Sequence, residues 1–417
     1  MRITYIHQYF NTPTMSGPMR SYELARRLVA KGHTVNMLTT NRGGSGGKEW
    51  TRSTEDGIQV HWLPVPYSNA MGLRDRFRAF VRFAIAASKK AASLKSDIIY
   101  ATSTPLTVVL PAAYASSRRG VPFVFEIRDI WPDVPVAMGL IRNRLVISLA
   151  QRLELFAYKR AASIVVLAPT MASVIHAKGV TLDKISAIPN GADPERFIGS
   201  PQFSTSRSGD GQKQPTRQRV LLYCGSLGPA HDPEYLVSLA EALLVGNEDV
   251  RIDIVGEGKM LDDLVSRAAR TGCLDKTIRF LGRASQSELP GLYAQADATI
   301  MTMADCELLY RHSVQNKFFE GLAAGLPVFA NYRGWASQVA EAAGAGLILP
   351  RHEITTAARM LSDRIWDDDW CNACSVAARS LICSRFNFDL LADELEVILV
   401  DALEKDKGTD SQTEVRV

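Results

Sequence analysis

The stretch Tyr310–Asn331, YRHSVQNKFFEGLAAGLPVFAN, has a polar, basic start and an apolar end. Gly325 suits the C-terminal cap of a helix and Pro327 cannot continue one, so the stretch predicts a loop, a short helix and a buried strand. The helix would begin near residues 315–317. Free N–H groups and the positive end of the helix dipole favour a phosphate at that point.

Charged side chains surround the predicted helix start. Arg311 and Lys317 place two cations beside it, and the backbone from Asn316 to Phe318 supplies N–H groups. Glu320 comes one helical turn after Asn316 and therefore faces the same mouth. This arrangement predicts a nucleotide site, with a diphosphate at the helix start and ribose hydroxyls at the carboxylate.

The rest of the 417-residue chain alternates apolar strand patterns with amphipathic helix patterns, which is typical of α/β folds. Residues 198–218 are rich in Ser, Gln, Gly and Arg and read as a linker or mobile loop. We predict two Rossmann-like domains, at 1–197 and 219–385, that face each other across a cleft. A C-terminal helix at 386–404 would pack back on the N-terminal domain, and the tail at 405–417 would be disordered.

Composition excludes several classes of protein. The net charge of +4 is too mild to argue for nucleic acid. No signal-peptide pattern and no apolar run of about 18 residues occurs, so a cytoplasmic location is expected. The six cysteines form no disulfide framework. Cys371 and Cys374 form a CxxC within a helical pattern, which leaves a metal or redox role open beside that of ordinary thiols.

Two predicted helices in the first half are both basic and amphipathic. The helix at 73–95 combines Phe77, Phe80 and Ile85 with several arginines and lysines, and the helix at 142–160 repeats the pattern. Such helices are typical of membrane-surface binding. The alternative is an ordinary surface helix that packs its aromatic residues inward.

Two loops of the first half lie where an α/β sheet binds ligands. Ser16 and Gly17 precede a predicted helix and would let a ligand approach its N-terminus, although the segment could equally be a tight turn. Arg128, Asp129, Trp131 and Asp133 follow the carboxyl end of the predicted strand 122–126, which ends at Glu126. These two carboxylates, the Arg and the Trp are candidate substrate contacts, or the segment is a loop held by an Arg–Asp pair.

Ordered motifs then connect the two halves. They are IPNGADPERF at 188–197, IVGEG at 254–258, FLGR at 280–283, ELPGLY at 288–293 and EGLAAGLPV at 320–328. In order and spacing the chain resembles the family-four GT-B retaining glycosyltransferases, from residue 1 to about 401. The first half, with RDIWPD at 128–133, is similar to bacterial members that build surface polysaccharides, including N-acetylfucosamine-type transferases.

The resemblance implies a nucleotide-sugar donor, no cofactor and no obligatory metal. It implies that Glu320 binds the ribose hydroxyls. The helix start at 316–318 and the Ser16–Gly17 loop would bracket the diphosphate, and Gly256 and Arg283 would border the base.

The sequence departs from the family's pattern at three positions. His312 stands where the family has a second Glu, eight positions before Glu320. Gly225 begins a segment, GSLGPAHD, that lacks the family's Arg and Lys after the first C-terminal strand. Arg128 stands where the family has its catalytic-site His, after the strand 122–126. Arg311, Lys317 or Arg128 must therefore supply the charge that meets the diphosphate.

The resemblance implies a metal-independent transferase of a hexosyl or N-acetylaminosugar group, and UDP is the expected nucleotide because it is the commonest in that family. Arg128, Asp129, Glu126 and His312 are the candidate catalytic residues, and either Asp129 or Glu126 could orient the acceptor. The expected acceptor is a polyprenyl-diphosphate-linked sugar at the inner face of the cytoplasmic membrane, in lipopolysaccharide or other surface-polysaccharide synthesis. A soluble acceptor, a non-catalytic nucleotide-sugar-binding protein and a GT-B epimerase are the alternatives.

Overall fold

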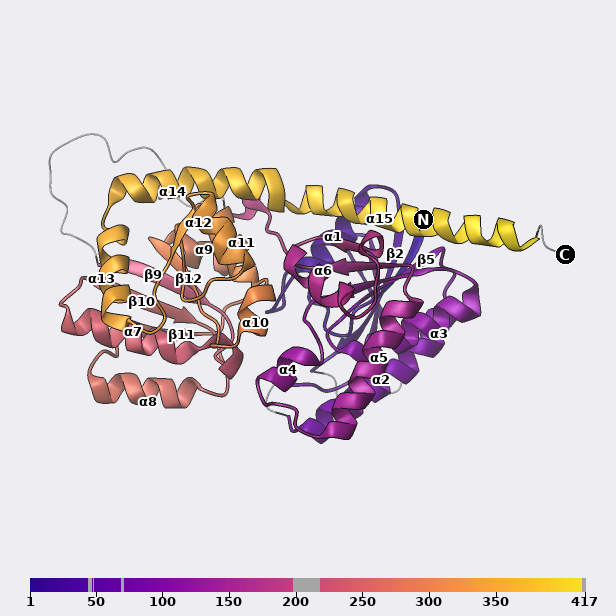
Figure 1. The fold of residues 1–417 in the computed structure, drawn as a ribbon, viewed down its shortest axis with the longest axis horizontal. Helices are drawn as coiled ribbons and strands as arrows, with labels where there is room; N and C mark the ends of the chain where they lie inside the picture. Colours follow the sequence, from indigo (N-terminus) through magenta and orange to yellow (C-terminus); the bar gives the residue numbers. More distant parts are fainter. Residues whose placement is uncertain (44–46, 48, 69–70, 198–217, 415–417) are drawn as a thin grey trace. The chain divides into compact units, whose positions relative to one another are not determined.

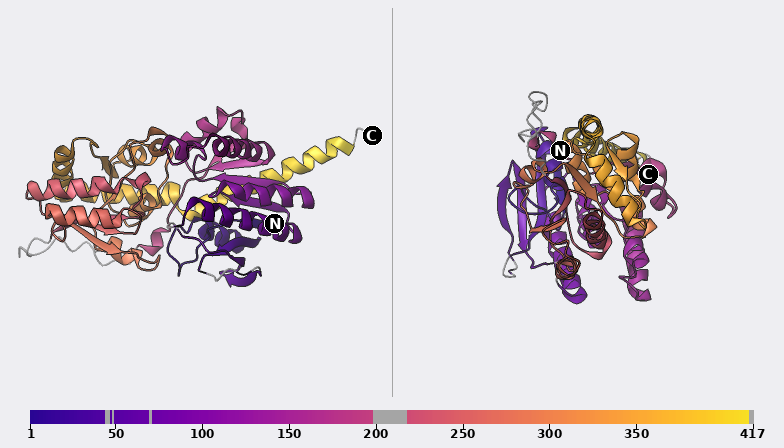
Figure 2. Two further views of the ribbon diagram at one scale, coloured as in Figure 1. Left: turned by 90° about the horizontal axis from the view of Figure 1, so that it is seen from below. Right: turned by 90° about the vertical axis from the view of Figure 1, so that its left-hand side faces the viewer.

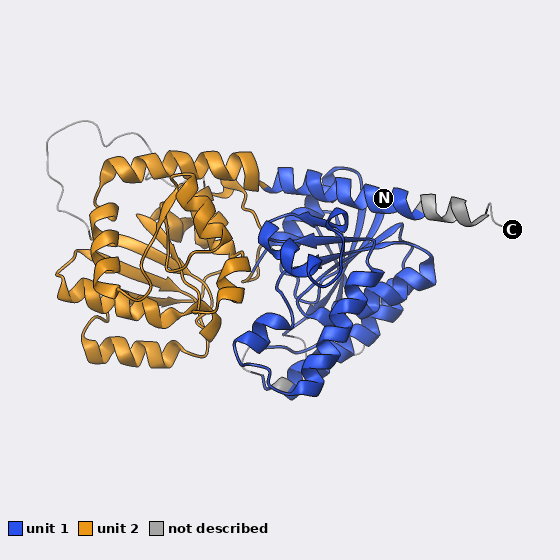
Figure 3. Ribbon diagram, viewed as in Figure 1, with its two compact units in different colours: residues 1–12, 18–189, 388–417 blue, residues 13–17, 190–387 orange. Residues whose placement is uncertain are grey.

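The computed structural model describes residues 1–43, 47, 49–68, 71–197 and 218–414, and the chain divides into two compact units (Figure 3). Unit 1 comprises residues 1–12, 18–189 and 388–417, and unit 2 comprises residues 13–17 and 190–387. The predicted linker at 198–218 lies, apart from Gln218, outside the described residues. The division after Pro189 precedes the predicted boundary by a few residues.

Unit 1 is built on an eight-stranded sheet in the order β3-β4-β2-β1-β5-β6-β7-β8. Neighbouring strands are parallel except for the β3–β4 hairpin, which is antiparallel. The strands are β1 (Arg2–Ile6), β2 (Thr34–Asn41), β3 (Thr51–Glu55), β4 (Ile58–Pro64), β5 (Ile98–Thr102), β6 (Phe123–Ile127), β7 (Ser163–Val166) and β8 (Ile185–Ala187).

Helices cover the sheet of unit 1, with α1 and α15 packed against each other and α2, α3 and α5 packed together elsewhere on the unit (Figures 1 and 2). None of the described helices is long and apolar enough to cross a bilayer. The helices are α1 (Arg20–Ala30), α2 (Leu73–Ser93), α3 (Val109–Arg119), α4 (Asp133–Ala137), α5 (Arg144–Arg160), α6 (Pro169–His176) and α15 (Phe388–Glu414).

Unit 2 has a six-stranded parallel sheet in the order β11-β10-β9-β12-β13-β14. Its strands are β9 (Arg219–Cys224), β10 (Val250–Val255), β11 (Ile278–Gly282), β12 (Ala298–Met301), β13 (Val328–Ala330) and β14 (Gly346–Ile348). Its helices are α7 (Pro233–Val245), α8 (Leu261–Thr271), α9 (Leu289–Ala294), α10 (Glu307–His312), α11 (Asn316–Ala323), α12 (Trp335–Ala342), α13 (Ile354–Ile365) and α14 (Asp368–Leu381).

Alternate residues of strand β9 point into two hydrophobic cores of unit 2. Leu221 and Tyr223 join the core under α7, α8 and α13, whereas Leu222 and Cys224 join the core under α9, α11, α12 and α14. This alternation is the expected result of burying both faces of a parallel sheet. The carboxyl end of β9 is thereby fixed against helix α11.

The chain enters and leaves unit 2 at neighbouring points. Ala192 pairs with Asn387 in a parallel bridge, and the N–H of Ala192 donates to the carbonyl of Phe386 at 3.2 Å. Asn190, the first residue of the longer part of unit 2, donates through its side chain to the carbonyl of Val314 at 2.9 Å.

The loop, helix and strand predicted for Tyr310–Asn331 are confirmed by α11 and β13, with Gly325 at φ +69° as the helix ends. Other details differ. The predicted loop begins with the end of α10, and β3, α4 and α12 were not predicted. Helix α15 spans Phe388–Glu414, whereas the sequence predicted a helix to 404 and a disordered tail from 405.

Candidate functional site

Lys317 is a buried cation in the first turn of α11. Only 5% of the residue is exposed, and the side-chain nitrogen, Nζ, lies 3.5 Å from the centre of the Tyr223 ring. Nζ makes no hydrogen bond to any described residue. Burial lowers the pKa of Lys317 to about 7, although Cys224 and Glu320 oppose the shift.

Gly225, the residue after β9, leaves the space that the ammonium of Lys317 fills. A Cβ atom at position 225 would lie 2.6 Å from Nζ. Gly256, the residue after β10, is packed just as closely, because a Cβ there would lie 1.8 Å from the carbonyl oxygen of Gly225. A side chain at either position would therefore clash with other atoms. At position 225 these are atoms of the Lys317 side chain, and at position 256 they are backbone atoms of Gly225.

Glu320 lies one turn further along α11 and is half-buried. Its Oε2 accepts a hydrogen bond from the hydroxyl of Tyr293 at 3.0 Å. Burial raises the pKa of Glu320, and the Tyr293 hydroxyl and the charge of Arg196 act against that rise. Lys317 and Glu320 lie one turn apart on α11, and the charge of each affects the pKa of the other.

At the start of α11, Phe318 is not open to solvent. The N–H of Phe318 donates to the carbonyl of Gln315 at 3.2 Å, and the Phe318 side chain is fully buried against Phe319 and Phe386. The side chain of Phe318 is therefore part of the hydrophobic core, and a contact between its backbone N–H and the diphosphate stays a prediction. Asn316, the first residue of α11, is half-buried.

Arg311 and His312 end the short helix α10. The exposed guanidinium of Arg311 pairs with Glu307 at 3.3 Å. His312 is 8% exposed and its Nδ1 has no hydrogen-bond partner among the described residues. Burial and then the charge of Arg311 lower the pKa of His312, so its imidazole is neutral at pH 7.

A hollow of about 390 Å³ lies beside the carboxyl ends of β10 and β11. Arg283 lines it and donates to the hydroxyl of Ser16 at 2.6 Å, while Gln286 donates to the carbonyl of Gly17 at 2.9 Å. Residues 13–17 belong to unit 2, so these contacts lie within one unit. The structure thus brings together Ser16, Gly17 and Arg283, which the sequence placed at different parts of the nucleotide.

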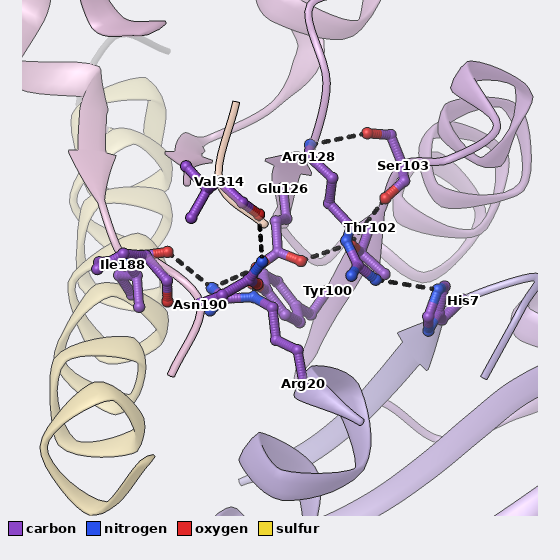
Figure 4. A network of polar contacts seen from close by, with 11 residues as sticks. His7, Arg20, Tyr100, Thr102, Ser103, Glu126, Arg128, Ile188, Asn190 and Val314 are labelled. Atoms are coloured by element: carbon purple, nitrogen blue, oxygen red, sulfur yellow. Dashed lines mark hydrogen bonds and ion pairs between the residues drawn. The ribbon is translucent and has the colours of Figure 1, made fainter. Parts of the chain in front are cut away.

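In unit 1, Glu126 is fully buried and both of its oxygens are bonded (Figure 4). Oε2 accepts from Arg20 at 2.7 and 2.9 Å and from the hydroxyl of Tyr100 at 2.6 Å, and Oε1 accepts from Thr102 at 2.5 Å. Arg20 also donates to the carbonyl of Ile188 at 2.9 Å. Glu126 therefore anchors the chain at the end of unit 1, and its prediction as an acceptor-orienting group is wrong.

Arg128 and Asp129 follow β6 at the carboxyl edge of the same sheet. The guanidinium of Arg128 lies 3.4 Å from Nε2 of His7, and its backbone N–H donates to Ser103 at 3.0 Å. Asp129 is exposed and accepts from Thr104 at 3.3 Å. These side chains can contact a ligand, whereas Glu126 beneath them cannot.

Tyr223, Tyr293 and His7 are site residues that the sequence did not reveal. Each contacts a predicted site residue that lies far away in the sequence, namely Lys317, Glu320 and Arg128. Such a contact cannot be predicted from the spacing of residues within one helix or strand.

Two family profiles together cover most of the chain. Residues 18–191 match the glycosyl transferase 4-like domain, and residues 218–364 match glycosyl transferases group 1. These ranges correspond to the main parts of unit 1 and unit 2.

Curated relatives resemble the chain at low identity. The D-inositol 3-phosphate glycosyltransferase of Corynebacterium jeikeium is 26% identical over 47% of this chain and 47% of that protein. The chain spans about half the length of the first curated relatives it matches. The UDP-Gal:alpha-D-GlcNAc-diphosphoundecaprenol alpha-1,3-galactosyltransferase of Escherichia coli is 22% identical, over 93% of this chain and 95% of that protein.

Solved structures of other proteins have the same overall fold as this chain. Anabaena Alr3699/HepE in complex with UDP and glucose superposes with a TM-score of 0.66, over 96% of this chain and 100% of that chain, at 17% identity. An identity this low speaks for the fold alone. With both domain profiles matched in order, the chain belongs to the GT-B glycosyltransferases that join a glycosyl transferase 4-like domain to a group 1 domain.

Proposed function

We propose that the protein is a retaining glycosyltransferase that moves a sugar from a UDP-sugar to a hydroxyl of a polyprenyl-diphosphate-linked sugar. The observation that carries this proposal is the buried Lys317 at the start of α11, with Glu320 one turn further on. The name of the Escherichia coli relative supports both the UDP donor and the lipid-linked acceptor.

The donor site would lie in unit 2. Lys317 and the N-terminus of α11 would meet the charge of the diphosphate, and Glu320 would accept hydrogen bonds from the ribose hydroxyls. The base would occupy the hollow that Arg283 lines, near Gly256. We assign the diphosphate to Lys317 and not to Arg311, because the exposed guanidinium of Arg311 already pairs with Glu307.

The reaction needs little acid–base chemistry. The bond from the anomeric carbon to the diphosphate breaks, and the acceptor oxygen forms a bond to the same face of that carbon. The acceptor proton passes to a phosphate oxygen of the departing nucleoside diphosphate. Positioned cations and helix N–H groups stabilise that leaving group. Arg128 and Asp129 would bind the acceptor at the sheet edge of unit 1, and the neutral His312 would contact the donor sugar.

A thermal-shift panel of UDP-, GDP-, ADP- and dTDP-sugars tests the donor site. Ligand stabilisation grows with concentration over the dissociation constant, so UDP-sugars should raise the melting temperature most. Glu320→Gln should reduce that shift and lower turnover about 10- to 100-fold, because a charge-assisted hydrogen bond is lost. Unchanged turnover in Glu320→Gln would remove Glu320 from the site.

A transfer assay tests the reaction itself. The donor panel is incubated with GlcNAc-diphosphoundecaprenol and, in parallel, with free GlcNAc, and the product's anomeric configuration is read by NMR. Transfer to the lipid with retention supports the proposal. Transfer to free GlcNAc alone favours a soluble acceptor, and binding without transfer by any donor favours a nucleotide-sugar-binding protein.

A surface of unit 1 supports the lipid-linked acceptor. Phe77 and Ile85 on α2 are 63% and 58% exposed, and Leu145 and Leu149 on α5 are 76% and 65% exposed. Exposed arginines and lysines lie on the same helices, namely Arg74, Arg78, Lys89, Arg144, Arg152, Lys159 and Arg160, and the exposed Arg142 lies two residues before α5. Apolar side chains among cations fit the boundary of an anionic bilayer. The protein would thus lie at the inner face of the cytoplasmic membrane as a peripheral protein.

Flotation with vesicles tests this surface. Vesicles that contain phosphatidylglycerol should carry the protein, and vesicles of phosphatidylcholine alone should carry much less. Serine at Phe77, Ile85, Leu145 and Leu149 should abolish flotation. The matched control is serine at Val245 and Val376, which are 88% and 71% exposed in unit 2. Flotation that is lost equally in both variants, or absent in the wild type, contradicts membrane binding.

A further inference from the structure

A buried cation without a hydrogen-bond partner lowers the stability of the folded protein, because it loses its hydrogen bonds to water and gains none from the protein. Lys317 is in this position: its Nζ makes no hydrogen bond to the described residues and contacts the face of the Tyr223 ring. A cation over a ring face gains part of the lost hydration energy, but the ammonium keeps its three donors unused. An anion that reaches Nζ would complete the arrangement.

Two titratable neighbours of Lys317, Cys224 and His231, keep the same protonation state near neutral pH. Burial raises the pKa of Cys224 to about 12, so its thiol stays neutral. Burial and the charge of Lys317 lower the pKa of His231 to about 3, so its imidazole is neutral as well. Glu320 is held by the Tyr293 hydroxyl. Of Lys317, Cys224 and His231, Lys317 is therefore the group whose charge changes near neutral pH. Burial raises the pKa of Glu320, and the Tyr293 hydroxyl and the charge of Lys317 oppose that rise.

We propose that Lys317 binds the donor diphosphate through a proton-linked step, and that Tyr223 and Gly225 are positioning residues that hold its side-chain nitrogen in place. The inference rests on the proposed donor site. As the diphosphate binds, a neutral amine takes one proton from the solvent and becomes the ammonium that the phosphate oxygens contact. The same proton returns to solvent once the nucleoside diphosphate has left.

The direction of the pH dependence follows from the pKa of about 7 in the free protein. Below that value Lys317 is already charged, and binding takes up no proton. Above it, only the protonated fraction is competent, so the apparent dissociation constant rises as that fraction falls. From pH 6 to pH 8.5 the protonated fraction falls, and the affinity with it, about 30-fold.

Calorimetric titration with UDP-glucose tests the proposal, because its diphosphate does not titrate between pH 6 and 8.5. We expect affinity to fall about 30-fold over this range and proton uptake to rise from near zero to near one. Proton uptake is read by repeating each titration in buffers of different ionisation enthalpy. Uridine, which lacks the diphosphate, is the control and should show no linked proton.

Variants separate the three residues. Lys317→Arg keeps the charge at all these pH values and should bind with a flat profile. Lys317→Met should weaken binding about 10- to 100-fold at pH 6 and also flatten the profile. Tyr223→Phe keeps the ring and should keep the wild-type profile, whereas Tyr223→Leu should move its midpoint to lower pH. Gly225→Ala should weaken binding at pH 6, because its Cβ displaces Nζ.

The outcomes distinguish this inference from the proposed function. If UDP-glucose binds well but with a flat profile in the wild type, the proton-linked step is overturned and the donor site stands. If Tyr223→Leu and Gly225→Ala both follow the wild-type profile, they are not positioning residues. If neither UDP-glucose nor the GDP-, ADP- or dTDP-sugars bind at pH 6, the donor site and the inference fail together. Melting curves of each variant identify any that do not fold.

Discussion

Arg20 and Glu126 are opposite charges with no exposure to solvent, and they show how burial decides the role of a residue. The sequence placed Glu126 at the end of a strand, where ligands bind, and so predicted substrate contact. In the structure Glu126 is fully buried beneath the surface of the sheet edge, so a ligand cannot reach it. Its oxygens are filled by protein donors, and Arg20 extends the network to the chain that leaves unit 1.

Removing one partner of this pair should be severely destabilising. Glu126→Gln leaves the guanidinium of Arg20 buried without a counter-charge and should cost about 3–5 kcal/mol in the free energy of unfolding. The double variant Arg20→Met/Glu126→Leu should cost less, because no charge remains buried. Urea unfolding measures both, and a double variant less stable than the single one would contradict this.

The same pair should make stability sensitive to acid. Burial alone would raise the pKa of Glu126, but the charge and hydrogen bonds of Arg20 outweigh burial and lower it to about 2. A depressed pKa contributes stability that is complete above the ordinary value near 4.5 and is lost as the pH falls towards 2. The stability difference between wild type and the double variant should therefore shrink from pH 5 to pH 3 in urea titrations. A constant difference would contradict the role of Glu126.

Gly256→Ala should destabilise unit 2 by several kcal/mol, because its Cβ would meet the carbonyl oxygen of Gly225 at 1.8 Å. The matched control is Gly291→Ala in helix α9, where a Cβ meets no atom within 4 Å. That control should be neutral or about 0.5–1 kcal/mol more stable. Chemical unfolding of the two variants compares them, and equal stability would mean that the loop yields.

At the scale of elements, α15 shows how a terminal helix is held. Phe388, Leu391, Leu395 and Leu399 form a buried stripe along it. Charges reinforce its first turns, where Lys31, the residue after α1, pairs with Glu396 at 2.9 Å and His33 contacts the same carboxylate at 2.7 Å. The helix therefore belongs to unit 1, although it follows unit 2 in the sequence.

Leu395→Ala should cost about 2–5 kcal/mol in unfolding free energy, because a fully buried side chain leaves a cavity. Val397→Ala on the same helix is the control, since Val397 is 57% exposed. It should change stability by less than about 0.5 kcal/mol. Thermal or urea unfolding of both variants is the measurement, and similar losses would show that α15 does not pack through this stripe.

Most strands and long helices could be predicted because their apolar periodicity is strong. The exceptions have physical reasons. Strand β3 is an edge strand with the polar sequence TRSTE, so it shows no apolar alternation. Helix α12 has eight residues, and α10 has six, both too short for a clear period. Lys317 and Glu320 were predictable from helical spacing, but the Tyr223 ring beneath Lys317 was not, since it comes from a strand that lies far away in the sequence.

At the scale of the whole molecule, the two units should respond to different ligands. In hydrogen exchange, a UDP-sugar should protect amides at the start of α11 and after β9, both in unit 2. Anionic vesicles should instead protect α2 and α5 of unit 1. Protection of α2 and α5 by the UDP-sugar alone, or of α11 by vesicles alone, would contradict this division.

The bridge between Ala192 and Asn387 bears on how such proteins diversify. Because the chain enters and leaves unit 2 side by side, residues 190–387 form a cassette with adjacent ends. Recombination could replace this cassette at two neighbouring joints and leave α15 on its own unit. A laboratory chimera made at the same joints would exchange the nucleotide-sugar half while it keeps the basic helices that we propose for the membrane.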